Sequence, residues 1–305
     1  MDRFTAMRMF TRVVELRSFT RAADSLGVPK ATLSLNIQEL ETLLGVKLLN
    51  RTTRQVSPTS DGAAYYENAL RLLQDIEEVE SSLTHAVTTA KGRLRVDASA
   101  SARDTIIPVL PEFYERYPDI QLELGCSDRP VDLVQENVDC VIRAGDIVDH
   151  SLAGRKIGEF RNITCGTQAY FSRYGKPETV ADLENHIFIN YFSSRTGKMR
   201  SWVFEKDGIR TTHRGKHLIA LNDGEAYVRA GIAGLGLFQA PSHAVQAYLD
   251  AGIAEQILKD YDSDSTVFHI LYPPNRHLSA RVRVFSEWVA TVFSRLEDKS
   301  RARSS

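Results

Sequence analysis

Two sets of side chains in the first sixty residues are suited to contacts with nucleic acid. One set would face outward from a run with helical spacing: Lys30, Ala31, Thr32, Ser34, Leu35 and Gln38. Small and hydrogen-bonding side chains near a helix N-terminus can approach base edges in a major groove. The second set, Arg51 and Arg54, is suited to phosphates or to the minor groove. A helical bundle with a solvated basic face is the alternative interpretation.

Patterns that carry catalysis are missing from the sequence. It contains no G-x-S-x-G elbow, no H-E-x-x-H and no phosphate-binding loop. The string AGIAGLGLFQAP is rich in glycine, but it follows a predicted helix and opens a strand, the reverse of a dinucleotide-binding fingerprint. We therefore expect no enzyme and no cofactor. A two-domain α/β enzyme with a helical oligomerisation appendage is the alternative.

A metal site is not expected either. His213 and His217 are four residues apart, but residues 212–214 are predicted to be a strand, so both are interpreted as surface residues. The cysteines fit no zinc spacing, and we expect buried, unreactive side chains, with a redox-sensing pair as the alternative, at Cys126, Cys140 and Cys165.

The elements that would position the first set form a helix-turn-helix. A helix is predicted over Phe4–Leu16, and Thr20 is the predicted N-cap of a short second helix. Gly27 suits a left-handed C-cap, and Pro29 suits the start of a third helix. The third helix has the apolar stripe Leu33, Ile37, Leu40 and Leu44. The run VKLLNRTTRQVSPT then predicts two short strands around a basic tip, a wing.

This N-terminal pattern resembles that of the bacterial LysR-type transcriptional regulators. The matching positions are Ala22, Ala23, Leu26, Val28, Ser34, Ile37, Leu40, Glu41, Leu44, Gly45, Leu48 and Arg51, followed by the tail VSPTSDG. The resemblance implies binding to double-stranded promoter DNA and control of RNA polymerase. The chain departs from the family at two positions. Pro29 replaces the usual serine, and Leu35 replaces a basic or polar residue.

Residues 61–90 are predicted to form a linker helix that makes a dimer. Residues 1–60 carry nine Lys/Arg and five Asp/Glu, whereas residues 61–90 carry one Arg and six Asp/Glu. Apolar residues in this acidic segment alternate in steps of three and four, as in a coiled-coil seam. The predicted seam is Tyr65, Ala69, Leu72, Ile76, Val79 and Leu83. A homodimer would read two half-sites, and the family resemblance implies that dimers pair into tetramers.

Residues 91–300 alternate between strand and helix patterns, which predicts an α/β domain with a mostly parallel sheet. Helices are expected over Thr105–Tyr117, Val131–Glu136 and Ser279–Leu296, and a hairpin over Trp202–Arg214. The family resemblance implies a two-lobed effector domain similar to periplasmic binding proteins. Lobe I would contain residues 91–161 and 267–300, and lobe II residues 162–266. The complete expectation is a winged helix-turn-helix head of residues 1–60, the linker helix and this effector-binding domain.

A small-molecule effector is expected between the lobes, because ligands of such sheets bind beyond the carboxyl ends of strands. The candidate contacts are Ser99, Ala100, Ser101, Asp128, Arg143, Ala144, Tyr191, Asp223 and Gln239. Hydroxyls and free amides at Ser99 and Ser101 suit a carboxylate that Arg143 would pair with, and an aromatic effector is the alternative. Turn-forming and helix-capping roles are the structural alternative for each residue.

The sequence gives no sign of a membrane partner. No apolar run approaches the roughly 18 residues that span a bilayer. The first residues are interrupted by charges and lack the apolar region of a signal peptide. We therefore expect a cytoplasmic protein.

Overall fold

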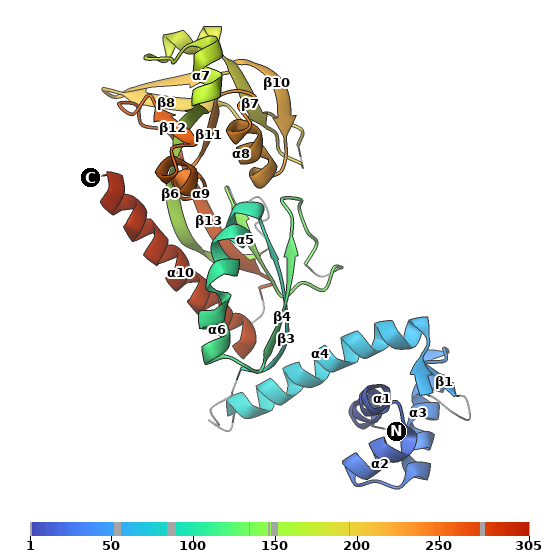
Figure 1. The fold of residues 1–305 in the computed structure, drawn as a ribbon. Helices are drawn as coiled ribbons and strands as arrows, with labels where there is room; N and C mark the ends of the chain where they lie inside the picture. The colour runs from blue at the N-terminus through green and yellow to red at the C-terminus, as the bar shows by residue number, and fades with distance from the viewer. Residues whose placement is uncertain are drawn as a thin grey trace. The chain divides into compact units, whose positions relative to one another are not determined.

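The computed structural model describes residues 2–51, 56–83, 90–133, 135–145, 147, 152–194, 196–274 and 278–304. They form two compact units, one within residues 1–89 and one within residues 90–305 (Figure 1). The first unit is called the head below, and the second the C-terminal unit. The division falls between residues 89 and 90, one residue before the predicted start of the effector domain at residue 91.

The head is built from α1 (Arg3–Leu16), α2 (Phe19–Leu26) and α3 (Lys30–Leu44), which enclose an apolar core. Gly27 ends α2 in the left-handed conformation, as predicted, with φ of 65°. The predicted cap of α2 is wrong. Ser18 caps this helix through a 3.3 Å hydrogen bond from the Arg21 N–H, because the extended backbone ends at Ser18 and Thr20 already lies inside the helix.

The apolar stripe of α3 is buried in its first three members, Leu33, Ile37 and Leu40. Leu44 is 39% exposed, contrary to the prediction, because the helix ends there at a left-handed Gly45. In the last turns of α3 the charged side chain of Glu41 is buried, whereas that of Leu44 is not.

The predicted wing is present in the head. β1 (Leu49–Arg51) and β2 (Val56–Pro58) pair antiparallel, and α4 (Ser60–Leu83) follows them. The Thr59 N–H donates to the Leu48 carbonyl at 2.9 Å. Gly62, in the first turn of α4, lies so close to that carbonyl that a Cβ atom would overlap its oxygen. The start of α4 is therefore packed directly against the wing.

The C-terminal unit contains a mixed sheet whose strands run in the order β11-β6-β13-β5-β3-β4. β3 lies parallel to both of its neighbours, and β13 lies antiparallel to β5 and to β6. β12 also pairs with β6. The bounds are β3 (Gly92–Ala98), β4 (Ile120–Cys126), β5 (Cys140–Ala144), β6 (Ala153–Thr167), β11 (Phe238–Pro241), β12 (Ala254–Ile257) and β13 (Ser265–Tyr272).

Long strand β6 and strand β13 run between two lobes (Figure 1). The first lobe has β3, β4 and β5 with helices α5 (Ala100–Ile106), η1 (Ile107–Val109), α6 (Leu110–Arg116) and α10 (Ala280–Ser304). The second lobe has further strands β7 (Ile187–Tyr191), β8 (Trp202–Lys206), β9 (Ile209–His213) and β10 (Lys216–Leu221). Its helices are α7 (Gln168–Tyr174), η2 (Ala181–Asn185), α8 (Gly224–Ile232) and α9 (Ser242–Asp250). Each lobe has its own apolar core.

Several predicted elements of this unit need correction. The helix expected over Thr105–Tyr117 begins at Ala100 and is divided into α5, η1 and α6, because Pro108 and Pro111 lack the N–H that a continuous helix needs. The described residues within 131–136 form turns, since this segment is too short to pay the cost of helix nucleation. The final helix extends to Ser304.

The predicted hairpin is formed by β8 and β9. Its turn residues Asp207 and Gly208 both have positive φ, 53° and 75°, as a two-residue hairpin turn requires.

Candidate functional site

The outer face of α3 carries the predicted base-contacting residues. Exposed residues on this face are Lys30, Ala31, Thr32, Leu35 and Gln38, and Ser34 is half-buried. Leu35 is 55% exposed, so an apolar side chain is available on this face for contact with a partner. Arg51 belongs to β1, but its side chain and the whole of Arg54 lie outside the described residues. This face of α3 thus carries mostly neutral side chains, several of them small or hydrogen-bonding, and one basic residue, Lys30, at its start.

Pro29 gives α3 an uncapped N-terminus. It occupies the N-cap position with φ of −61° and makes no side-chain hydrogen bond to the helix. The first intrahelical bond is made by the Leu33 N–H to the Pro29 carbonyl at 3.1 Å. The preceding N–H groups at this end carry the positive end of the helix dipole, which favours phosphate groups.

Glu41 connects α3 to the wing, a role that sequence reasoning missed. Its carboxylate accepts hydrogen bonds from the N–H groups of Leu48 at 2.9 Å and Leu49 at 3.2 Å, and pairs with Lys47 Nζ at 3.1 Å. Burial alone raises the pKa of Glu41, but these hydrogen bonds outweigh it and lower the pKa below its ordinary value. The available signal was an acidic residue on the buried side of an apolar stripe.

A cavity of about 780 Å³ lies between the two lobes of the C-terminal unit. Seven of the nine predicted effector contacts line it: Ser99, Ser101, Asp128, Arg143, Ala144, Tyr191 and Gln239. Ala100 and Asp223 do not. The buried Ala100 supplies a backbone N–H to Asp128, and Asp223 caps α8 by accepting from the Ala226 N–H at 2.8 Å. The strand ends therefore bring most of the predicted set together, as the position of ligands in such sheets suggests.

Arg143 lines the cavity, but it already has a carboxylate partner within the sheet. Its guanidinium bonds the Asp97 carboxylate at 2.5 Å and the Asp97 carbonyl at 3.2 Å. Asp97 lies on neighbouring strand β3, so the charge of Arg143 is already compensated within the sheet. Ser99 is different: its hydroxyl is buried, lines the cavity and has no hydrogen-bond partner among the described residues.

The second lobe contributes an aromatic wall to the cavity. The rings of Tyr191 and Tyr227 meet edge to face with centroids 6.0 Å apart. The Tyr227 hydroxyl accepts from the Gln239 N–H at 2.9 Å, and burial raises the Tyr227 pKa to about 12. Burial, with Asp128 and Asp223 nearby, also raises the pKa of Tyr191. Both phenols are therefore neutral donors or acceptors at physiological pH.

Arg200 is a cavity-lining residue that sequence reasoning missed. Its side chain is exposed and has no carboxylate partner among the described residues, whereas Lys156 pairs with the lining residue Glu159 and Arg210 pairs with Asp264. Its backbone N–H donates to the Tyr191 carbonyl at 2.8 Å, and its positive charge partly offsets the rise that burial causes in the pKa of both wall tyrosines. Arg200 follows an irregular loop in the sequence, so no periodicity pointed to it.

Neither a candidate metal site nor a candidate membrane span is found in the part of the chain that the structure describes. The described residues contain no cluster of three potential metal ligands and no helix long and apolar enough to span a bilayer. The cysteines are free, and burial raises the pKa of the Cys140 and Cys165 thiols. Cys126 is exposed, contrary to the prediction, because it is the last residue of its strand.

Comparison with known families covers both units. A model described as a bacterial regulatory helix-turn-helix protein of the lysR family matches residues 4–63, and a LysR substrate binding domain model matches residues 88–294. The chain belongs to the LysR family of transcriptional regulators. As a LysR-type regulator it combines a DNA-binding head with an effector-binding domain, which confirms the predicted fold class and function.

Individual relatives of this LysR-type chain agree. It is 36% identical to the uncharacterized HTH-type transcriptional regulator YhjC of Escherichia coli K12, covering 98% of this chain and 100% of YhjC. It is 38% identical to an HTH-type transcriptional repressor of Pseudomonas aeruginosa strain UCBPP-PA14, covering 96% and 93%. The solved structure of CrgA, a LysR-type regulator from Neisseria meningitidis, matches with a TM-score of 0.60 and 28% identity, covering 95% and 98%. These relatives are regulators, which argues against the enzyme alternative.

Proposed function

We propose that α3 is the recognition helix for a specific promoter sequence. Its exposed face carries the proposal, with Lys30, Ala31, Thr32, Ser34, Leu35 and Gln38 at base edges. The small side chains of Ala31, Thr32 and Ser34 let the helix lie deep in the major groove. Leu35 can contact a thymine methyl group. The wing arginines Arg51 and Arg54 would bind phosphates or the minor groove.

Replacing Arg51 with alanine should weaken DNA binding to a similar extent on every sequence. A lost phosphate contact releases one counterion fewer, so the slope of log affinity against log salt should flatten by about 1. Titrations at several salt concentrations, on a specific and an unrelated fragment, measure both quantities. Lys216→Ala, a change of an exposed cation on β10, is the matched control. An unchanged slope would remove Arg51 from the interface.

The linker helix is proposed to form the homodimer through a shorter seam than the sequence suggested. Tyr65 packs edge to face on Phe10 in the core of its own head, with ring centroids 5.5 Å apart, and Ala69 is already fully buried within the single chain. Leu72 and Ile76 are 46% and 39% exposed on α4 and are free to meet a partner helix. Val79 and Leu83 continue this spacing, but their side chains lie outside the described residues. Dimers would then pair into tetramers.

The proposed effector binds in the inter-lobe cavity and carries both an aromatic ring and an acidic group. Tyr191 and Tyr227 offer an apolar wall, Arg200 offers an uncompensated positive charge, and the unpartnered Ser99 hydroxyl offers a hydrogen bond. A buried hydroxyl without a partner costs free energy that a ligand can recover.

Arg200→Ala should weaken the binding of benzoate, the simplest probe of this class, by about tenfold, because a charge-assisted hydrogen bond is lost. Titration calorimetry on the full-length protein measures the change. Lys198→Ala removes an exposed cation two residues away that does not line the cavity, and it should leave benzoate binding unchanged. Equal losses in both variants would mean that general charge, and not Arg200, attracts the ligand.

In this mechanism the effector binds two arrangements of the oligomer with different affinities. The change would alter the spacing or bend of the bound DNA, and thereby the access of RNA polymerase, in the bacterial cytoplasm. Footprinting of fragments from the chain's own genomic neighbourhood, over a salt series, tests the proposal. We expect a protected dyad at nanomolar protein that is lost steeply with salt. Absence of selective protection with and without effector candidates would contradict promoter recognition.

A further inference from the structure

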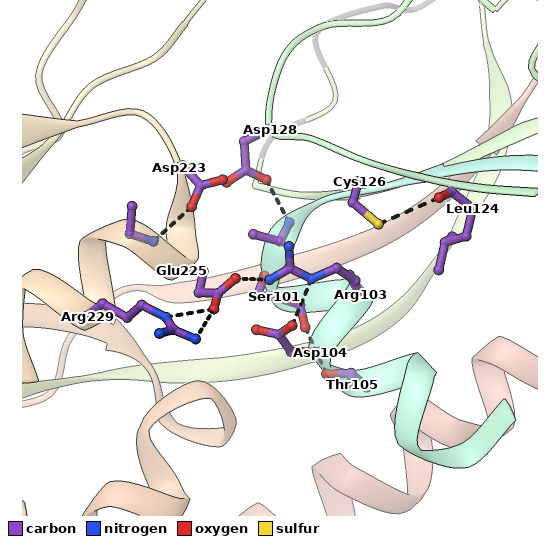
Figure 2. A network of polar contacts seen from close by, with 12 residues as sticks. Ser101, Arg103, Asp104, Thr105, Leu124, Cys126, Asp128, Asp223, Glu225 and Arg229 are labelled. Atoms are coloured by element: carbon purple, nitrogen blue, oxygen red, sulfur yellow. Dashed lines mark hydrogen bonds and ion pairs between the residues drawn. The ribbon is translucent and has the colours of Figure 1, made fainter.

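One carboxylate in the C-terminal unit accepts hydrogen bonds from both lobes. Asp128 lies in the loop after β4. Its Oδ1 accepts from the Ala100 N–H at 2.9 Å, and its Oδ2 accepts from the Gly224 N–H at 2.6 Å. Ala100 begins α5 in the first lobe, and Gly224 begins α8 in the second. Figure 2 shows Asp128 with its hydrogen bond to the start of α5 and beside Asp223, the N-cap residue of α8.

An ion pair joins the same two helices, one turn further along α5 and one residue further along α8. Arg103 of α5 pairs with Glu225 of α8 (Figure 2). Each partner is also held within its own lobe, Arg103 by Asp104 at 2.8 Å and Glu225 by Arg229 at 2.6 Å. Hydrogen bonds from both arginines lower the pKa of Glu225, so the carboxylate is charged at neutral pH. The Arg103–Glu225 pair thus crosses the gap between the lobes, and together with Asp128, Asp104 and Arg229 it forms one network.

The Asp128 contacts are not ordinary helix capping. Asp223 already caps α8, through its bond to the Ala226 N–H. The Gly224 N–H is left over at this helix end and is satisfied by a residue 96 positions earlier in the sequence. A carboxylate at two helix N-termini is favoured by both dipoles, so the bond between the lobes is a strong one.

The cavity lies between this network and the strands that join the lobes. Asp128 and Gly224 line it from the network, and Glu159 and Thr266 line it from β6 and β13. At the crossing strands, Asn162 holds Thr266 Oγ1 at 2.8 Å, so the joint between lobes is itself ordered by a buried side chain. The lobes can move apart about these strands only if the network breaks.

We propose that Asp128, supported by Arg103 and Glu225, is a built-in bridge that holds the lobes closed over the cavity without a bound effector. The bridge also restricts where an acidic effector can bind. Because Asp128 already accepts hydrogen bonds from both helix N-termini, the acidic group must pair with Arg200 or displace Asp128. This inference rests on the effector role proposed for the cavity, but the bridge itself is testable without a ligand.

Hydrogen exchange of the full-length, effector-free protein tests the bridge. Asp128→Asn keeps the size of the side chain but replaces one accepting oxygen with an NH₂ group that faces an N–H. Exchange should rise by about tenfold or more in peptides covering residues 99–104 and 223–228, which belong to different lobes. Asp223→Asn is the matched control, because asparagine also caps helices, and it should not accelerate the α5 peptide.

Glu225→Gln gives a second test that leaves Asp128 intact. It weakens the Arg103 pair and should accelerate both peptides by a smaller factor. If Asp128→Asn accelerates α10 peptides as well, the unit has lost its fold and Glu225→Gln decides. Faster exchange in the α5 peptide alone in Asp128→Asn would overturn the bridge. If Asp128→Asn has lost its fold, unchanged exchange in Glu225→Gln would overturn it. DNA binding on the same variants tests the regulator proposal separately, since the head is unaltered.

Discussion

Replacing Ile76 with aspartate is expected to convert the dimer into monomers. Ile76 is 39% exposed in the single chain and lies one helical turn from Leu72, which is 46% exposed. In the proposed seam both side chains are covered by the partner helix, where an aspartate would be buried without a counter-charge. The cost of such a change is about 3–5 kcal/mol, which raises the dimer dissociation constant by at least about a hundredfold.

Sedimentation velocity at micromolar protein measures this change directly. Ala64→Asp places the same charge on an exposed position of α4 outside the seam, and it should remain dimeric. Promoter affinity should fall in parallel for Ile76→Asp, because a monomer binds one half-site only. An intact dimer in the Ile76→Asp sample would refute the seam and would require a different dimer interface.

Replacing Glu41 with alanine should destabilise the head by about 2–4 kcal/mol. The substitution leaves the buried N–H groups of Leu48 and Leu49 without an acceptor and cuts the connection between α3 and the wing. For a domain of this size the melting temperature should fall by about 10 °C or more. Calorimetry of the full chain, with Glu39→Ala as an exposed control on the same helix, measures the loss.

The same carboxylate predicts how head stability depends on pH. The pKa of Glu41 is lowered from 4.5 in the folded head, so its contribution is complete above that value and is lost as pH falls through the lowered pKa. Glu41→Gln should therefore reduce stability at pH 7 and flatten the decline below about pH 4.5. A variant whose acid denaturation matches the parent curve would show that Glu41 does not carry this dependence.

Local sequence patterns predicted the elements of the head well. The spacing of Leu33, Ile37 and Leu40 defines α3 because a helix repeats every 3.6 residues, and Gly27 and Gly45 mark helix ends that need positive φ. The hairpin predicted over Trp202–Arg214 is likewise local, and its turn residues Asp207 and Gly208 also have positive φ. These structures are determined by residues close together in the sequence, so they can be predicted without knowledge of the tertiary fold.

Contacts between distant segments could not be predicted from such local patterns. Arg143 was assigned to a ligand, but its partner Asp97 is 46 residues away on an adjacent strand. Asp128 was predicted as a cavity residue, and only the fold shows that its carboxylate joins residues 28 and 96 positions away. Ala69 fits a heptad seam as well as it fits an intramolecular core, and periodicity alone does not distinguish the two.

Because Gly62 packs so closely against the wing, the head and the start of α4 should move together as one rigid body, which acts as a lever. A helix of 24 residues is about 36 Å long. A tilt of about 10° at its far end therefore moves the wing by about 6 Å, nearly the width of a minor groove. Small motions delivered to the end of α4 would thus be amplified into a change of register on the DNA. Any side chain at position 62 larger than hydrogen would loosen this lever and reduce the transmitted motion.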